Sequence, residues 1–149
     1  MSVDERANLK LLGKNQEDLK VISAYLQDSI LIIKDTVFLK QNRTFIMIVN
    51  RFMWEDVEKG VFRQNKRIRS AVKFDEVIKV KSRNINQKNK NKPLECLAIK
   101  CSSTFDETYK IKIFFAGDSI ITITSEVIEV TLHDLGKPWQ VKHIPVHKI

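Results

Sequence analysis

The feature that most constrains the fold is a series of short apolar segments with a period of two, which extends from residue 30 to residue 124. Alternating apolar and polar side chains are typical of strands with one buried face. Turn-forming residues separate the segments, and such short connections join antiparallel neighbours, because a parallel crossover needs about a dozen residues. We predict strands over residues 30–33, 37–40, 45–54, 68–74, 77–82, 94–101, 109–115 and 120–124.

One helix is predicted ahead of these strands. Asn15 can cap it, and Asp18 stands at the third helical position, where a carboxylate can accept a reciprocal hydrogen bond. Leu19, Ile22 and Leu26 then fall on a single helical face. The pattern predicts a helix over residues 16–28.

The stretch from residue 126 to residue 135 has two interpretations. Its β-branched residues favour a strand, whereas the spacing of Ile128, Leu132 and Leu135 ahead of Gly136 favours a short helix. We take the helix as the expectation. The predicted fold is therefore α+β: an antiparallel meander, curled into a roll or partly open barrel, with an N-terminal helix and a short C-terminal helix.

Length and composition predict one cytoplasmic domain over residues 1–149. A chain of this length with 43% hydrophobic residues can bury one core without disulfides. The N-terminal stretch has acidic residues where a signal peptide would be basic and then apolar, and no apolar run approaches the length of a membrane span. Cys96 and Cys101 are five apart in one predicted strand, which places them on opposite faces and makes a local disulfide improbable.

Positive charge is concentrated in one part of the chain. Residues 61–100 contain twelve Lys or Arg and three acidic residues, whereas the rest of the chain contains 14 basic and 15 acidic residues. This regional excess favours an anionic partner. The run NINQKNKNK, residues 84–92, is predicted to be a mobile basic loop.

The two strands ahead of this loop form the strongest candidate site. Alternation buries Ile68, Val72, Ile78 and Val80, and a hairpin through Asp75 and Glu76 would place six cations on one sheet face. They are Arg67, Arg69, Lys73, Lys79, Lys81 and Arg83. Nucleic acid or another polyanion would suit this face, although only Phe62 and Trp54 offer stacking platforms. The competing interpretation is an ordinary solvated face in a chain whose lysine excess reflects an AT-rich coding sequence.

The stretch FIMIVNRFMWE, residues 45–55, changes from apolar to mixed character at Asn50. By alternation Phe52 and Trp54 continue the buried face, while Arg51 and Glu55 must reach water. The stretch indicates a strand that leaves the core. A second hypothesis follows, in which Arg51, Phe52 and Trp54 form a protein-interaction or assembly surface.

The sequence contains few of the motifs that are typical of catalytic or metal-binding sites. The three histidines lie in the last 17 residues, and neither a Gly-rich phosphate loop nor a nucleophile motif occurs. An enzyme would need an unrecognised carboxylate site, for which Asp28, Glu55 and Asp134 are candidates. A zinc site from Cys96, Cys101, His143 and His147 has permissible spacing, but the cysteines do not lie in a tight turn. We predict no metal site, no catalytic residue and no cofactor.

Four stretches resemble a known family: LKLLGKNQEDLKVISAYLQDSI, VNRFMWE, KRIRSAVKFDEVIKVKSRNI and FFAGDSIITITSEVIEVTLHDLGKPW. Together they resemble the alphaproteobacterial family known as domain of unknown function 2948, over nearly the whole chain. The resemblance implies a small cytoplasmic protein. It implies no activity, because the family is uncharacterised.

Overall fold

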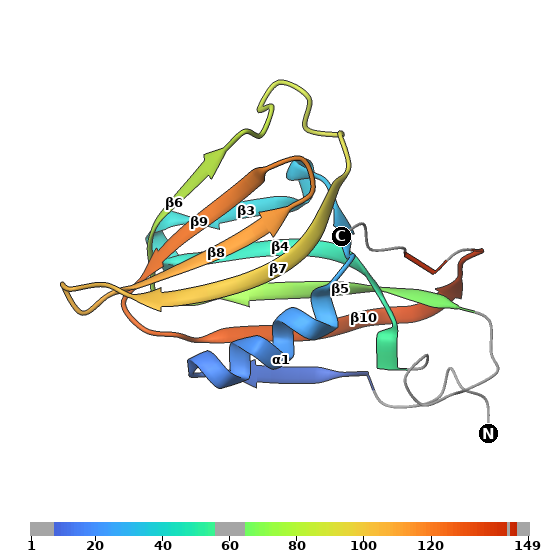
Figure 1. Ribbon diagram of the computed structural model, residues 1–149, viewed down its shortest axis with the longest axis horizontal. Coiled ribbons are helices and arrows are strands. Elements are labelled where there is room, and N and C mark those ends of the chain that lie inside the picture. Colours follow the sequence, from blue (N-terminus) through green and yellow to red (C-terminus); the bar gives the residue numbers. More distant parts are fainter. Residues whose placement is uncertain (1–7, 56–64, 143, 146–149) are drawn as a thin grey trace.

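The structure, a computed structural model, describes residues 8–55, 65–142 and 144–145. Within these ranges ten strands form one antiparallel sheet (Figure 1). The strands are β1 (Lys10–Gly13), β2 (Ile30–Leu31), β3 (Thr36–Leu39), β4 (Thr44–Phe52), β5 (Lys66–Phe74), β6 (Val77–Arg83), β7 (Leu94–Ser103), β8 (Tyr109–Phe115), β9 (Ser119–Ser125) and β10 (Val130–Gln140). Their order is β1-β10-β5-β4-β2-β7-β8-β9-β6, and β3 pairs with β4. The sheet is not closed, because β1 and β6 stand at its two ends.

The predicted N-terminal helix is confirmed as α1 (Gln16–Leu26), which ends two residues earlier than expected. The Asn15 side chain accepts a hydrogen bond from the Asp18 N–H at 2.8 Å. The Asp18 carboxylate accepts one from the Lys14 N–H at 3.0 Å. Leu19, Ile22 and Leu26 are buried on one face, as the spacing predicts. Two short 3₁₀ turns, η2 (Ile33–Asp35) and η3 (Lys40–Asn42), flank β3.

The sheet folds over a hydrophobic core to which strands from both of its ends contribute. Side chains of β4, β5 and β10, such as Met47, Val72 and Leu132, belong to the same buried cluster as Ile113 of β8 and Ile123 of β9. The two parts of the sheet therefore face each other across the core. The helix α1 contacts β1 and β4 on one side and β7 on the other. It therefore covers the core between the part of the sheet that contains β4, β5 and β10 and the part that contains β7, β8 and β9. An α+β domain with a mostly antiparallel sheet is thus confirmed.

The short helix predicted for residues 126–135 is wrong, because residues 130–140 form β10. This strand pairs with β5 on one side and with β1 on the other. The strand preference of the β-branched residues is therefore the interpretation that holds, since β5 offers an edge with which residues 130–135 and 139–140 pair. Gly136, with φ +68°, lies in an irregularity of the β10–β5 register rather than at a helix end. The strand β1 was not predicted.

The hairpin predicted through Asp75 and Glu76 is also absent. The two edges of β5 are occupied by β4 and β10, and β6 pairs with β9 instead. The chain turns a corner between the strands, where Glu76 has φ +54°. A register irregularity follows Val77, so Val77 is buried and Ile78, predicted to be buried, is exposed. The six predicted cations therefore lie in two different parts of the sheet.

Candidate functional site

The three predicted cations of β5 are engaged with the protein itself. The Arg67 guanidinium donates to the backbone oxygens of Asp28 at 3.0 Å and Asn50 at 2.9 Å. It lies 5.7 Å from the centre of the Phe52 ring, and burial lowers the pKa of Arg67, an effect that the Asp28 charge opposes. Arg69 lies 3.5 Å from an oxygen of Asp35, and Lys73 lies 3.5 Å from one of Asp75. The three cations of β5 therefore already have partners within the protein.

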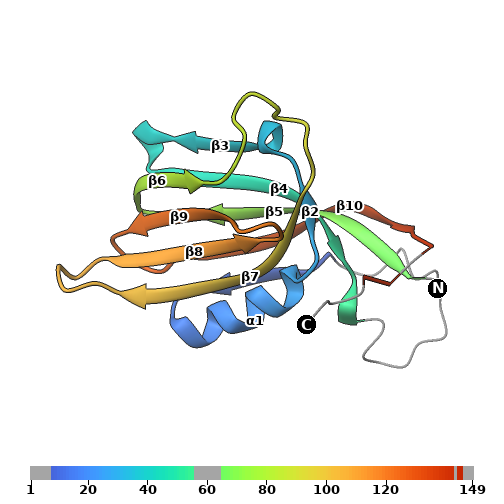
Figure 2. The ribbon, with the colours of Figure 1, turned by 45° about the horizontal axis from the view of Figure 1, so that its top comes forward.

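The three predicted cations of β6 have a different environment. Lys79, Lys81 and Arg83 are exposed, and none has an ion pair with the part of the chain that the structure describes. They lie on the outer surface of the four strands β6, β9, β8 and β7, which follow one another in the sheet. In Figure 2 no described element lies in front of β7, β8 and β9. The surface is therefore open to solvent.

Three further lysines share this outer surface. On β8, Ile111 and Ile113 are buried, so Lys110 and Lys112 point outward; on β7, Ile99 is buried and Lys100 is exposed. We define the basic face as the following six residues. They are Lys79, Lys81, Arg83, Lys100, Lys110 and Lys112.

The strand register arranges the basic face in rows across the four strands. One row runs Lys81, Thr122, Lys112, Lys100; a second runs Lys79, Thr124, Lys110, Ser102; a third runs Arg83, Ile120, Phe114, Ala98. These twelve outward positions hold six cations and no acidic residue. Lys100 lies directly opposite Lys112, and like charges in that arrangement repel each other. The Lys100 ammonium also lies 5.8 Å from the centre of the Phe114 ring.

The sequence contains a signal for Lys110 and Lys112, which were not among the predicted site residues. Lys110 and Lys112 alternate with Ile111 and Ile113, the pattern of a strand with one basic face. The prediction joined only strands that follow each other directly in the chain. The outer surface instead combines β6 with β8 and β7, which come later.

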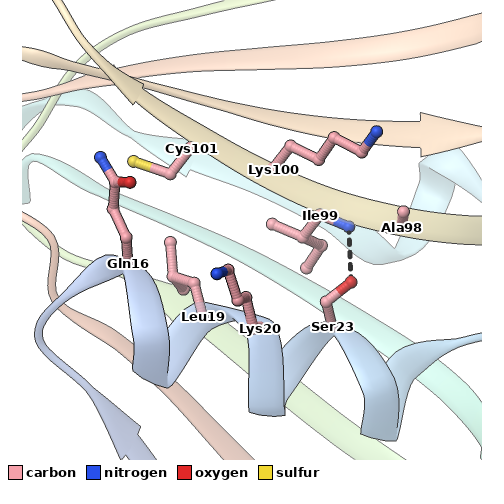
Figure 3. A pocket seen from close by; sticks show the side chains of 8 residues that line it. All are labelled: Gln16, Leu19, Lys20, Ser23, Ala98, Ile99, Lys100 and Cys101. Carbon is pink, nitrogen blue, oxygen red and sulfur yellow. Dashed lines mark hydrogen bonds between the residues drawn. The ribbon is translucent and has the colours of Figure 1, made fainter.

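A pocket of about 400 Å³ borders the basic face at Lys100 and lies between α1 and β7. Figure 3 shows Gln16, Leu19 and Ser23 pointing from the helix toward the strand. Lys20 and Cys101 also line the pocket. The Ser23 hydroxyl accepts a hydrogen bond from the Ile99 N–H at 2.9 Å. The pocket thus combines apolar and hydrogen-bonding groups beside a positive surface.

The expectation that Arg51 reaches water is wrong, since its side chain is 0% exposed. Its guanidinium donates to both oxygens of Asp134 at 2.8 and 2.7 Å and to both oxygens of Glu55 at 2.9 and 2.7 Å. The Ser70 hydroxyl also donates to Asp134, at 2.6 Å. Burial acts to lower the pKa of Arg51, but the two carboxylates reverse this effect and raise it. We call these four residues the arginine cluster.

The arginine cluster joins two of the three carboxylates proposed for a catalytic site. Glu55 and Asp134 meet at Arg51, whereas Asp28 lies near Arg67 and Cys96. A pocket that Glu55 and Trp54 line measures about 80 Å³. The cluster holds β4, β5 and β10 together.

The interaction surface predicted around Trp54 is largely covered. Phe52 is 0% exposed, as is Arg51, so neither side chain can meet a partner in this structure. The Trp54 ring packs against Phe52 with 4.6 Å between ring centres. Its indole N–H donates to the Gln27 backbone oxygen at 2.8 Å, and this bond ties Trp54 to the end of α1.

The cysteines lie on the same face of β7, contrary to the predicted opposite faces. A register irregularity between Cys96 and Ala98 inserts one residue, so Cys96 pairs with Phe115 and Cys101 with Ile111, both of which are buried. Both thiols are free. His143 and His147, the other proposed zinc ligands, lie outside the described residues. The described residues contain no cluster of metal-binding side chains.

Comparisons with known proteins give a family. In the described ranges no helix is long and apolar enough to cross a membrane. No curated protein and no solved structure matches the sequence. One family, described as "Protein of unknown function (DUF2948)", matches residues 9–147. Because this match covers nearly the whole sequence, the chain belongs to the DUF2948 family of proteins of unknown function.

Proposed function

We propose that this protein is a non-catalytic module that binds nucleic acid through the basic face. The observation that supports the proposal is the composition of the twelve outward positions on β6, β9, β8 and β7, which hold six cations and no acid. A salt-bridged surface would have acidic residues interspersed among them. Phosphate groups would supply the missing negative charge and relieve the repulsion between Lys100 and Lys112.

The arrangement favours contact with the nucleic acid backbone. Lysine ammonium groups bind phosphate as point charges without reading a base sequence. Thr122 and Thr124 stand between the lysine positions and offer hydroxyl donors to phosphate oxygens. We therefore propose binding with little sequence preference. We place it in the cytoplasm, where two free thiols are the normal state.

The salt dependence of binding tests this proposal. If all six cations contact phosphates of a single strand, the logarithm of the association constant falls with the logarithm of salt concentration with a slope of about −4, a loss of about 300-fold between about 50 and 200 mM salt. The slope is measured by fluorescence anisotropy with a labelled oligonucleotide. The triple variant Lys79→Gln, Lys81→Gln, Lys112→Gln is expected to reduce its magnitude by about 2, with three contacts removed.

A matched control removes the same net charge elsewhere. Lys10, Lys14 and Lys73 are exposed on or near β1, α1 and β5, away from the basic face. Their triple replacement by glutamine should leave the slope near that of the parent. Equal losses in the two triple variants, or no binding of any oligonucleotide at low salt, would refute a specific role for the basic face.

A further inference from the structure

The pocket between α1 and β7 has the chemistry of a site for a flat polar ring. Leu19 and Ile99 provide apolar surface, and Gln16 provides an amide that can donate and accept hydrogen bonds (Figure 3). Gln16 is exposed and Leu19 is buried, so the polar group lies at the mouth and the apolar group lies deeper. Sites for small organic ligands combine these features.

The edge of β7 adds backbone groups to this pocket. The strand pairs with β8 on one side, while β2 pairs with it only at Leu94 and Glu95. Beyond these residues the described chain places no strand on that side, and the Ile99 N–H reaches the Ser23 hydroxyl of α1 instead. Backbone groups alternate between the two edges of a strand. The carbonyl of Ile99 and both backbone groups of Cys101 therefore point toward the pocket.

Two lysines line the pocket, and in Figure 3 the ammonium group of Lys100 points away from α1. Lys20 lines it from α1, and Lys100 lines it from β7 while it also belongs to the basic face. Lys20 pairs with Glu17 at 3.2 Å, but both side chains are largely exposed, and such pairs are weak enough to exchange for a phosphate. A ligand that combines a flat ring with hydrogen-bonding edges and an attached phosphate matches this set.

We propose that this pocket binds a nucleotide, with the base between α1 and β7 and the phosphate between Lys20 and Lys100. The nucleotide is either free or one unstacked residue of a single strand that crosses the basic face. The second of these ligands, a residue of a bound single strand, rests on the proposed function. Because Lys100 is common to the pocket and the face, a strand can occupy both without a break.

Oligonucleotides with and without bases test the proposal. An abasic strand has the same phosphates, so the basic face alone would bind it equally well. We expect the abasic strand to bind about tenfold more weakly than a normal strand of equal length, the scale of contacts to one base. The double variant Gln16→Ala, Lys20→Gln should remove most of that difference. The variant Lys14→Gln, a charge-matched control just before α1, should retain it.

Protection of Cys101 from alkylation tests whether the pocket binds free nucleotides. Cys101 lines the pocket and is half-buried, whereas Cys96 is 1% exposed, so the native protein should incorporate one alkyl group. Burial raises the pKa of Cys101, so the reaction is best followed by mass spectrometry at mildly alkaline pH. Adenosine or uridine 5′-monophosphate should slow alkylation in the parent and in Lys14→Gln, and should not slow it in the double variant.

The outcomes separate this inference from the proposed function. Protection by a mononucleotide without oligonucleotide binding supports a free-nucleotide site and refutes the proposed function. A base-dependent affinity that the double variant abolishes, without protection by mononucleotides, supports the strand as the source. Equal binding of normal and abasic strands together with no protection overturns the pocket and leaves the basic face standing. The pocket is also overturned if the double variant still binds the normal strand more tightly than the abasic strand, because the bases then bind elsewhere.

Discussion

Replacing Arg51 by alanine, or Asp134 by asparagine, is expected to lower the free energy of unfolding by about 3–5 kcal/mol. Both side chains are buried, at 0% and 3% exposure, and they share two hydrogen bonds of 2.8 and 2.7 Å. Arg51→Ala leaves the buried Asp134 carboxylate without its arginine counter-ion, and Asp134→Asn leaves the fully buried Arg51 with Glu55 as the one remaining carboxylate of the arginine cluster. Urea unfolding followed by circular dichroism measures the loss.

Two comparisons establish the cause of this loss. Arg43 forms an exposed ion pair with Glu126 at 2.8 Å, and Arg43→Ala should cost far less than Arg51→Ala. The triple variant Arg51→Met, Glu55→Met, Asp134→Leu removes the charges together and should recover part of the stability that Arg51→Ala loses, because no buried charge remains uncompensated. A triple variant less stable than Arg51→Ala, or an equal loss from Arg43→Ala, would contradict this account.

The arginine cluster also shows where local sequence reasoning reaches its limit. Arg51 lies on the same side of β4 as Phe45, Met47 and Val49, all of which are buried. The sequence pattern favours a solvent-exposed Arg51, because an uncompensated charge in a core is very costly. One of the two compensating carboxylates, that of Asp134, is 83 residues away in the chain and lies in a segment predicted to be helical. No pattern within residues 45–55 could have revealed it.

The basic face was partly predictable for a related reason. Alternation correctly assigned the outward direction of Lys79, Lys81 and Arg83, because a strand has only two faces. The choice of neighbouring strand was wrong, since a two-residue connection can turn a corner as well as close a hairpin. That choice depends on which edges are already occupied, and β10 reaches β5 from the far end of the chain. The helix α1 was predictable because its cap and its apolar face are both local.

The helix–strand pocket has no such local signature. It depends on α1 lying along the β7 edge beyond the two residues that pair with β2. The same packing removes Cys96 from solvent and leaves Cys101 at the pocket wall. Two cysteines that look equivalent in the sequence are therefore expected to differ in acidity and in their effect on stability.

The stability of the protein should decline in alkaline solution through Cys96. Burial raises the pKa of this thiol from 9.0 to about 12, and the Asp28 charge acts in the same direction, while a hydrogen bond from the Ala98 backbone opposes it. The unfolded chain loses the proton above about pH 9, whereas the folded protein keeps it until about pH 12. The neutral thiol therefore makes its full contribution to the stability of the folded protein below pH 9, and this contribution is lost as the pH rises toward 12.

The comparison with Cys96→Ala isolates this effect from the titration of other groups. Cys96→Ala is expected to be less stable than the parent at neutral pH, because it leaves a cavity in the core. The difference should shrink by about 2 kcal/mol between about pH 8 and pH 10.5, since only the parent has a thiol whose ionisation favours unfolding. Cys101→Ala, which removes the half-buried thiol, should show a smaller change. The prediction is wrong if the difference in the free energy of unfolding between the parent and Cys96→Ala stays constant over this pH range. Cys96 would then ionise as readily in the folded protein as in the unfolded chain.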